Sequence, residues 1–292
     1  ILFSSILGKT FWGEAVYDID KDGIDEIIAY NDTTYFTYKY QANNYTLMQN
    51  ADLPTQFKKL GVTKGSAIGD FDGDGNIELM HSNYYGNIFI FKYKDGKFNL
   101  TFLDTNNYGY SNPLISKIIL LGEKNPAIII GTYSSKMLFG KEEEQQTMWT
   151  YRLIKYDNNG SYNVQAILNI MGVRAGIDRR LGIGFRNGVL AADIDNLNGD
   201  ELIISAFPNT YVLKWNGTSF KPLWQYPYSF TNSAVVWDFD KNGKKEIGIA
   251  TYDSTSFFEI SMENSKPETP IVIDSYALSS ESGIIRWQKV DG

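Results

Sequence analysis

The chain has 292 residues, of which 43% are hydrophobic and 15% aromatic, so it can bury a sizeable core and is globular rather than disordered. Its 27 Lys and Arg residues against 34 Asp and Glu residues give a net charge of −7, which argues against nucleic acid or an anionic membrane as a partner. The absence of cysteine excludes disulfides, thiolate metal sites and a cysteine nucleophile, and no apolar run reaches the roughly 18 to 20 residues that span a bilayer.

Two near-identical acidic segments come first along the chain. Residues 18–26 (loop 1) and 70–78 (loop 2) both have Asp at positions one, three and five, Gly at position six and Glu at position nine. Behind loop 2, runs rich in Ile, Phe and Tyr at 87–93 and 97–102 flank a Lys-Asp-Gly turn, where glycine supplies the positive φ of a tight hairpin. The pattern predicts short antiparallel strands joined by acidic loops.

The same plan returns three more times. Residues 116–131 keep the strands without the acidic loop, and residues 238–246 (loop 4) keep the loop with Asn for Asp at position five. In residues 193–201 (loop 3) Asn-Gly stands one place later, so this turn is expected to differ. Five units of about four short strands predict an all-β fold, a β-propeller of four-stranded blades in a ring of roughly five to eight. A β-sandwich is the alternative fold.

One basic cluster stands out in this acidic chain, and it precedes loop 3. Arg174, Arg179 and Arg180 lie among glycines. Because arginine binds carboxylate or sulfate groups through two parallel hydrogen bonds, these residues are either a ligand-binding loop or a solvated connector. Five Asn-x-Ser/Thr sequons are candidate glycosylation sites: Asn31, Asn44, Asn99, Asn159 and Asn216.

The composition changes near Pro267. The stretch that follows resembles the first two strands of a fibronectin type III domain. We therefore expect residues 1–266 to form the repeat domain, and residues 267–292 to form a linker and the opening strands of a second module.

The acidic loops have the chemistry of a calcium site. Alternate residues of a tight loop turn carboxylates toward one centre, position seven offers a backbone carbonyl, and the Glu at position nine closes the shell. An EF-hand would need Glu at position twelve, where the loops have Ala29, His81 and Ile249. A purely polar turn is the alternative, but acids gathered without a cation repel one another. We expect about three calcium sites, or four with loop 3.

The predicted ligands are Asp18, Asp20, Asp22, Ile24 and Glu26 in loop 1; Asp70, Asp72, Asp74, Asn76 and Glu78 in loop 2; Asp238, Asp240, Asn242, Lys244 and Glu246 in loop 4; and Asp193, Asp195 and Glu201 in the looser loop 3.

The Asp-x-Asp-x-Asp-Gly-x-x-Glu pattern resembles the FG-GAP and VCBS repeats of integrin α-subunit heads and of microbial surface and secreted proteins. The resemblance covers loops 1, 2 and 4 and extends loosely over residues 1–266. It implies a β-propeller with calcium between the first two strands of a blade. It also implies an extracellular or cell-surface module that recognises a protein or a glycan, in adhesion or surface assembly, rather than an enzyme.

Two other functions stay open. Propellers with similar loops occur in polysaccharide lyases of the rhamnogalacturonan-cleaving type, although no acid-base pair stands out here and the sole histidine, His81, is expected to be packed in a strand. The chain could also be a structural component of a cell envelope or filament. The expected partners are a surface protein or glycan and further domains of the same polypeptide, without direct membrane insertion.

Overall fold

The computed structural model describes residues 12–31, 34–52, 62–83, 87–104, 114–133, 146–157, 159–173, 176–178, 183–185, 188–227, 229, 234–250, 254–260, 271–279 and 282–288. Strands are the only regular secondary structure in these ranges, in agreement with the predicted all-β class. No helix suited to crossing a membrane lies within them. The chain separates into two compact units, residues 1–259 and residues 260–292.

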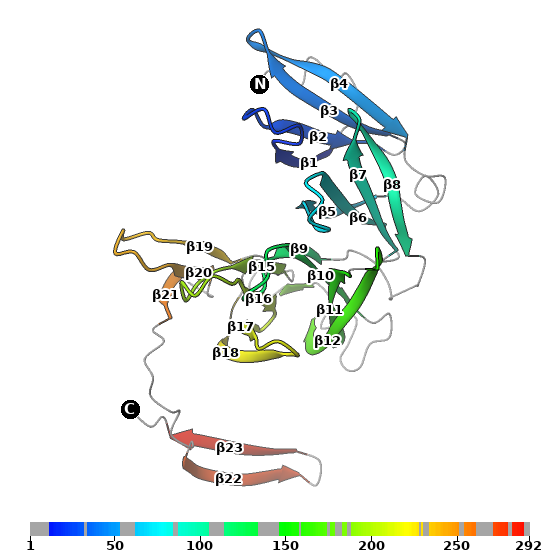
Figure 1. The fold of residues 1–292 in the computed structure, drawn as a ribbon. Helices are drawn as coiled ribbons and strands as arrows, with labels where there is room; N and C mark the ends of the chain where they lie inside the picture. The colour runs from blue at the N-terminus through cyan, green and yellow to red at the C-terminus, as the bar shows by residue number, and fades with distance from the viewer. Residues whose placement is uncertain are drawn as a thin grey trace. The chain divides into compact units, whose positions relative to one another are not determined.

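The larger unit contains five described antiparallel sheets of three or four strands, in which the strands follow one another in chain order (Figure 1). Sheet 1 comprises β1 (Trp12–Tyr17), β2 (Glu26–Tyr30), β3 (Thr34–Gln41) and β4 (Asn44–Asp52); sheet 2 comprises β5 (Val62–Gly69), β6 (Ile77–Asn83), β7 (Ile88–Lys94) and β8 (Lys97–Asp104); sheet 3 comprises β9 (Leu114–Ile118), β10 (Ala127–Tyr133), β11 (Gln146–Tyr156) and β12 (Tyr162–Val173); sheet 4 comprises β15 (Gly188–Ala192), β16 (Glu201–Ala206), β17 (Asn209–Trp215) and β18 (Phe220–Pro227); and sheet 5 has three described strands, β19 (Val235–Trp237), β20 (Glu246–Ala250) and β21 (Thr255–Glu259). The five sequence units thus correspond to five sheets, whose closure into a ring stays a prediction.

Two further hairpins complete the described strands. β13 (Gly176–Asp178) pairs with β14 (Ile183–Phe185) in the larger unit, and β22 (Ile271–Ser279) pairs with β23 (Ser282–Gln288) in the smaller one. The hairpin of the smaller unit lies within the segment that resembles a fibronectin type III domain, and that assignment stays a prediction. Residues 261–270, which include the predicted boundary at 266, lie outside the described residues.

The strands of sheet 2 are apolar on both faces because a neighbouring sheet covers each face. Along β7, Phe89 and Phe91 belong to a core shared with sheet 1, whereas Ile88 and Ile90 belong to a core shared with sheet 3. Successive side chains of a strand point to opposite faces, so a continuous apolar run is what two buried faces require.

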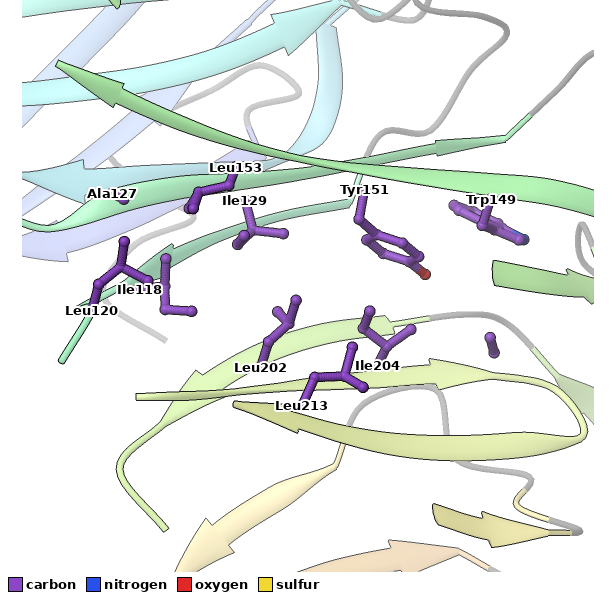
Figure 2. Close-up of a cluster of buried hydrophobic side chains, with 11 residues drawn as sticks. Ile118, Leu120, Ala127, Ile129, Trp149, Tyr151, Leu153, Leu202, Ile204 and Leu213 are labelled. Atoms are coloured by element: carbon purple, nitrogen blue, oxygen red, sulfur yellow. The ribbon is translucent and has the colours of Figure 1, made fainter. Parts of the chain in front are cut away.

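Sheets 3 and 4 share a core of the same kind (Figure 2). Leu202 and Ile204 of β16 face the Ile129 and Tyr151 side chains of sheet 3 across this interface, and all four are almost completely buried. Full burial of one such aliphatic or aromatic side chain contributes about 1.5–3 kcal/mol to stability.

Each sheet packs against the next one in the sequence. The first strands make contact in the succession β1, β5, β9 and β15. Sheet 5 joins through aromatic rings, since Phe258 lies 5.2 Å from Trp224 and 4.8 Å from Tyr226 of β18, measured between ring centroids. The larger unit is therefore a series of sheets stacked face to face in chain order.

Candidate metal centres

The four acidic loops occupy the same place in their sheets. Loops 1, 2, 3 and 4 join β1 to β2, β5 to β6, β15 to β16 and β19 to β20. Lys21 Nζ of loop 1 donates a hydrogen bond to the carbonyl oxygen of Gly75 in loop 2, and Asn196 Nδ2 of loop 3 donates to the carbonyl oxygen of Gly243 in loop 4 at 3.2 Å. The loops of neighbouring sheets therefore lie side by side.

The first Asp holds the backbone in loops 1, 2 and 4, and the final Glu holds it in all four loops. In loop 4, Asp238 Oδ1 and Oδ2 accept hydrogen bonds from the backbone N–H groups of Asn242 and Gly243, each at 3.0 Å. Glu246 Oε2 accepts the N–H of Phe239 at 2.7 Å, and the equivalent Glu–backbone bonds of loops 1, 2 and 3 measure 3.0, 2.8 and 2.9 Å. One carboxylate oxygen of each Glu therefore binds the loop backbone, and the other oxygen takes no part in this bond.

Each loop also gathers three acidic side chains whose candidate ligand atoms lie within 4.8 Å of one another, and such a cluster could hold a metal ion. The groups are Asp18, Asp20 and Asp22; Asp70, Asp72 and Glu78; Asp193, Asp195 and Glu201; and Asp238, Asp240 and Glu246.

The residues at position seven fix the turn through their backbone N–H groups. Ile24, Asn76 and Lys244 each donate to the side-chain oxygen of the residue at position five, at 3.0, 2.8 and 2.7 Å. Their carbonyl oxygens stay predicted ligands.

Loop 3 differs from the other loops in sequence but has left-handed residues at the same two positions. Its left-handed residues are Asn196 (φ 58°) and Asn198 (φ 61°), at positions four and six, where loop 4 has Lys241 (φ 62°) and Gly243 (φ 88°). The expectation of a different turn was therefore wrong, because Asn198 adopts the conformation that glycine adopts in the other loops.

A lysine of β3, Lys39, places its ammonium group among the acids of loop 1, and no sequence motif predicted this contact. Lys39 Nζ lies 2.5 Å from Asp20 Oδ2, 2.5 Å from Asp22 Oδ2 and 3.4 Å from Glu26 Oε1. The lysine side chain is 9% exposed, so its charge is held within the loop. It contacts three of the side chains that were expected to bind calcium.

Loops 2 and 3 contain lysines in the same place. Lys92 Nζ contacts Asp72, Asp74 (2.7 Å) and Glu78 (3.2 Å), and Lys214 Nζ contacts Asp195 and Glu201 (3.4 Å). Each lysine lies on the third strand of its sheet, directly across from the Glu at position nine. Glu78 pairs directly with Lys92. The pairs Ile27–Tyr38 and Leu202–Leu213, continued by one residue, place Glu26 across from Lys39 and Glu201 across from Lys214. The available sequence signal was a lysine between large apolar residues of an otherwise buried strand.

Burial and charge together set the protonation of these clusters. Burial raises the pKa of Glu78 to about 7, and it raises the pKa of Glu26 and of Glu201 as well. Hydrogen bonds to Asp20 and Asp22 raise the pKa of Lys39 above its usual range. This lysine therefore stays charged at neutral pH and supplies loop 1 with a cation from the protein itself.

On the third strand of sheet 5, across from the final Glu of loop 4, stands a glutamate and not the lysine found in sheets 1, 2 and 4. Glu246 pairs across the strands with Glu259 of β21, so two like charges face each other. Glu259 accepts hydrogen bonds from Lys244 Nζ (2.7 Å) and Asn242 Nδ2 (2.9 Å), which lower the pKa of Glu259. Glu246 is only 8% exposed, and its Oε1 is buried without a hydrogen-bond partner.

The other predicted sites are placed only in part. Arg174, Arg179 and Arg180 lie outside the described residues. Asn44, Asn99, Asn159 and Asn216 are exposed, whereas Asn31 is half-buried. His81 is fully buried, with its ring 5.3 Å from that of Tyr30 and 6.0 Å from that of Tyr35. A catalytic role for this histidine would need an access route that its burial denies.

Fold and loops together define an all-β protein with repeated acidic clusters. No family model matches the chain, and no curated protein matches it. Among solved structures, a rhamnogalacturonan lyase of Bacillus licheniformis is similar over 86% of this chain, with a TM-score of 0.52 and 15% sequence identity. The chain spans about half of that lyase, 49% of its length. At this identity the similarity shows a shared fold and nothing about activity.

Proposed function

We propose that this chain is a calcium-binding β-propeller of the FG-GAP and VCBS type, and that it serves as a non-catalytic recognition module outside the cell or on its surface. The observation that carries the metal is Glu246 Oε1, a buried carboxylate oxygen beside Asp238 and Asp240 that has no hydrogen-bond partner. The equivalent oxygens of Glu26 and Glu78 also lack a hydrogen bond but lie 3.4 and 3.2 Å from a lysine ammonium. Leaving such a group unpaired costs about 1–3 kcal/mol, and more when it is charged. A cation attracted by the neighbouring acids would remove this cost.

The donor set favours calcium among the biological cations. Carboxylate, amide and backbone oxygens are the groups in the loops, and the chain has no cysteine to offer a soft metal. Sites in extracellular modules have dissociation constants of roughly 0.1–1 mM, so calcium at ten times that level adds about 1.4 kcal/mol of stability per site.

The propeller assignment is supported by the order of the sheets. Four of them are four-stranded meanders, and successive sheets share cores on both faces. Contacts between first strands run in chain order from β1 to β15, as expected when the innermost strand of each blade follows that of the blade before.

The recognition role is supported by the acidic composition, the four exposed sequons and the resemblance to surface-protein repeats. A protein or a glycan displayed on a cell or in the matrix is the partner that this role requires. Arrays of glycans and of extracellular proteins, probed with calcium and then with chelator, would identify the partner.

The metal is tested by thermal unfolding of the purified chain with excess chelator and with millimolar calcium, together with a count of bound ions. We expect calcium to raise the unfolding midpoint by several degrees, because a ligand that binds only the folded state stabilises it. An unchanged midpoint and no retained ion would reject calcium binding.

A second candidate function is that of a polysaccharide lyase scaffold, and the observation that favours it is the fold shared with the rhamnogalacturonan lyase. Incubation of the chain with rhamnogalacturonan in calcium, with detection of the unsaturated ends that β-elimination leaves, separates the two candidates. Product formation that purified chain supports over many turnovers would make the chain an enzyme, and its absence would favour the recognition module.

A further inference from the structure

We propose that metal binding is confined to loop 4, because an internal lysine takes the place of the ion in loops 1, 2 and 3, and that Glu259 is an additional metal ligand. This inference rests on the proposed function, since it assumes that an acidic loop of this chain binds a divalent cation.

The lysine ammonium groups of loops 1 and 2 occupy the place of a metal ion. Lys39 Nζ touches the carboxylates at positions three, five and nine of loop 1, and Lys92 does the same in loop 2. Those are the side chains that a metal would have to bind. Two cations a few ångströms apart repel each other, so a divalent ion could bind these carboxylates only by displacing the ammonium.

Sheet 5 has the opposite charge at the cross-strand position. At the position across from the final Glu, sheets 1, 2 and 4 have lysine, and sheet 5 has Glu259. Like charges directly opposite each other on neighbouring strands are destabilising. A divalent cation between Glu246 and Glu259 would replace this repulsion with two attractive contacts. In the other three sheets the lysine ammonium provides the attraction to the final Glu.

Within the described residues, the second oxygen of the final Glu has a cationic neighbour in loops 1 and 2 but not in loop 4. Glu26 Oε1, Glu78 Oε1 and Glu246 Oε1 are all buried without a hydrogen-bond partner, but the first two lie 3.4 and 3.2 Å from a lysine ammonium. Among the described lysines and arginines, none forms a recorded ion pair with Glu246, whereas Lys244 pairs with Glu259. The Lys244 side chain is 57% exposed, and its recorded pair is with Glu259, not with the buried oxygen of Glu246.

Loop 3 combines an unpaired acidic oxygen with a lysine at the cross-strand position. Asp193 Oδ1 also lacks a hydrogen-bond partner, and the loop has the spacing of its acids in common with loop 4. Lys214 nevertheless contacts Asp195 and Glu201 there, so loop 3 is predicted to stay without metal. Lysine at the cross-strand position, and not the number of acids, decides which loop binds.

The experiment uses the full chain and calcium alone as the probe, with stoichiometry and affinity measured by isothermal titration. The wild type is expected to bind about one ion. Glu259→Lys installs the residue of the other three sheets and should abolish binding while the chain remains folded by circular dichroism. Glu259→Gln is the second variant and should weaken binding at least about tenfold, since it removes a ligand charge.

The converse variant is Lys92→Glu, which gives loop 2 the arrangement of loop 4 and should raise the stoichiometry to about two. Lys155→Glu, at the ion pair with Glu123, makes the same charge change outside the four acidic clusters and should leave the stoichiometry at one.

The outcomes separate the two proposals. A wild type that binds three or four ions, or a Glu259→Lys variant that binds as the wild type does, would overturn the confinement to loop 4 while calcium binding stands. A wild type that binds no ion would reject calcium binding itself.

Discussion

At the scale of single residues, position five distinguishes loop 4 from loops 1 and 2. Asn242 replaces the Asp of those loops, and its Nδ2 donates to Asp240 at 3.1 Å and to Glu259 at 2.9 Å. We expect Asn242→Asp to raise the calcium affinity roughly tenfold, because oxygen-ligand sites tighten as ligand charge is added. Calcium titration measures this. Asn216→Asp, in the exposed turn after β17, adds the same charge elsewhere, and an equal gain there would point to the net charge instead of the ligand.

Gly199 explains why Asn-Gly stands one place later in loop 3. A Cβ at this residue would lie 2.8 Å from the backbone of Leu121, in the turn between β9 and β10. Gly199→Ala is therefore expected to lower the free energy of unfolding by about 1–3 kcal/mol, since the backbone it meets cannot rotate away. Denaturant unfolding at constant calcium gives the value. Asn198→Gly, which relieves a left-handed residue, should instead be neutral or stabilising, and a loss as large as that of Gly199→Ala would reject the steric explanation.

At the scale of the strand and its loop, the exposure of the residue at position two of each acidic loop shows which sheet faces are covered. Ile19, Phe71 and Ile194 are buried there, whereas Phe239 of loop 4 is 48% exposed. Phe71 lies in the core shared by sheets 2 and 3. We expect Phe71→Ala to cost about 3–5 kcal/mol of stability and Phe239→Ala less than about 1 kcal/mol, since only the first leaves a cavity. Urea unfolding in saturating calcium compares the pair, and similar losses would mean that Phe239 is covered in solution.

The strands and acidic loops were predictable from the sequence because both depend on near neighbours in the chain. Alternating apolar runs and Gly-containing turns mark the hairpins, and the spacing of the acids marks the clusters. The lysine contacts were not predictable from these motifs. Whether Lys39 or Lys92 lies opposite the acids depends on the register of the second and third strands, which the motifs do not specify. For the same reason Glu259, thirteen places after Glu246, carried no recognisable signal.

At the scale of the whole molecule, the described contacts tie one sheet to the next without help from a metal. Shared cores join sheets 1 to 2, 2 to 3 and 3 to 4, and aromatic rings join sheet 4 to sheet 5. Asp200 adds a polar link, because its N–H and its carboxylate both bond to the backbone of Ile119 at 2.6 Å. Calcium is therefore expected to stabilise one end of the series rather than to hold the series together.

Hydrogen–deuterium exchange can locate that effect. In loop 4 the N–H groups of Asn242 and Gly243 bond to Asp238, and that of Phe239 bonds to Glu246. Removal of calcium restores the repulsion between Glu246 and Glu259, so exchange of peptides covering 234–250 should speed up severalfold, as expected for local opening. The equivalent peptides of loops 1, 2 and 3 should be unchanged by chelator, because their lysines remain. In Glu259→Lys, residues 234–250 should exchange alike with and without calcium. Faster exchange at all four loops on chelation would mean that the ion occupies them all, and that the lysines yield to it.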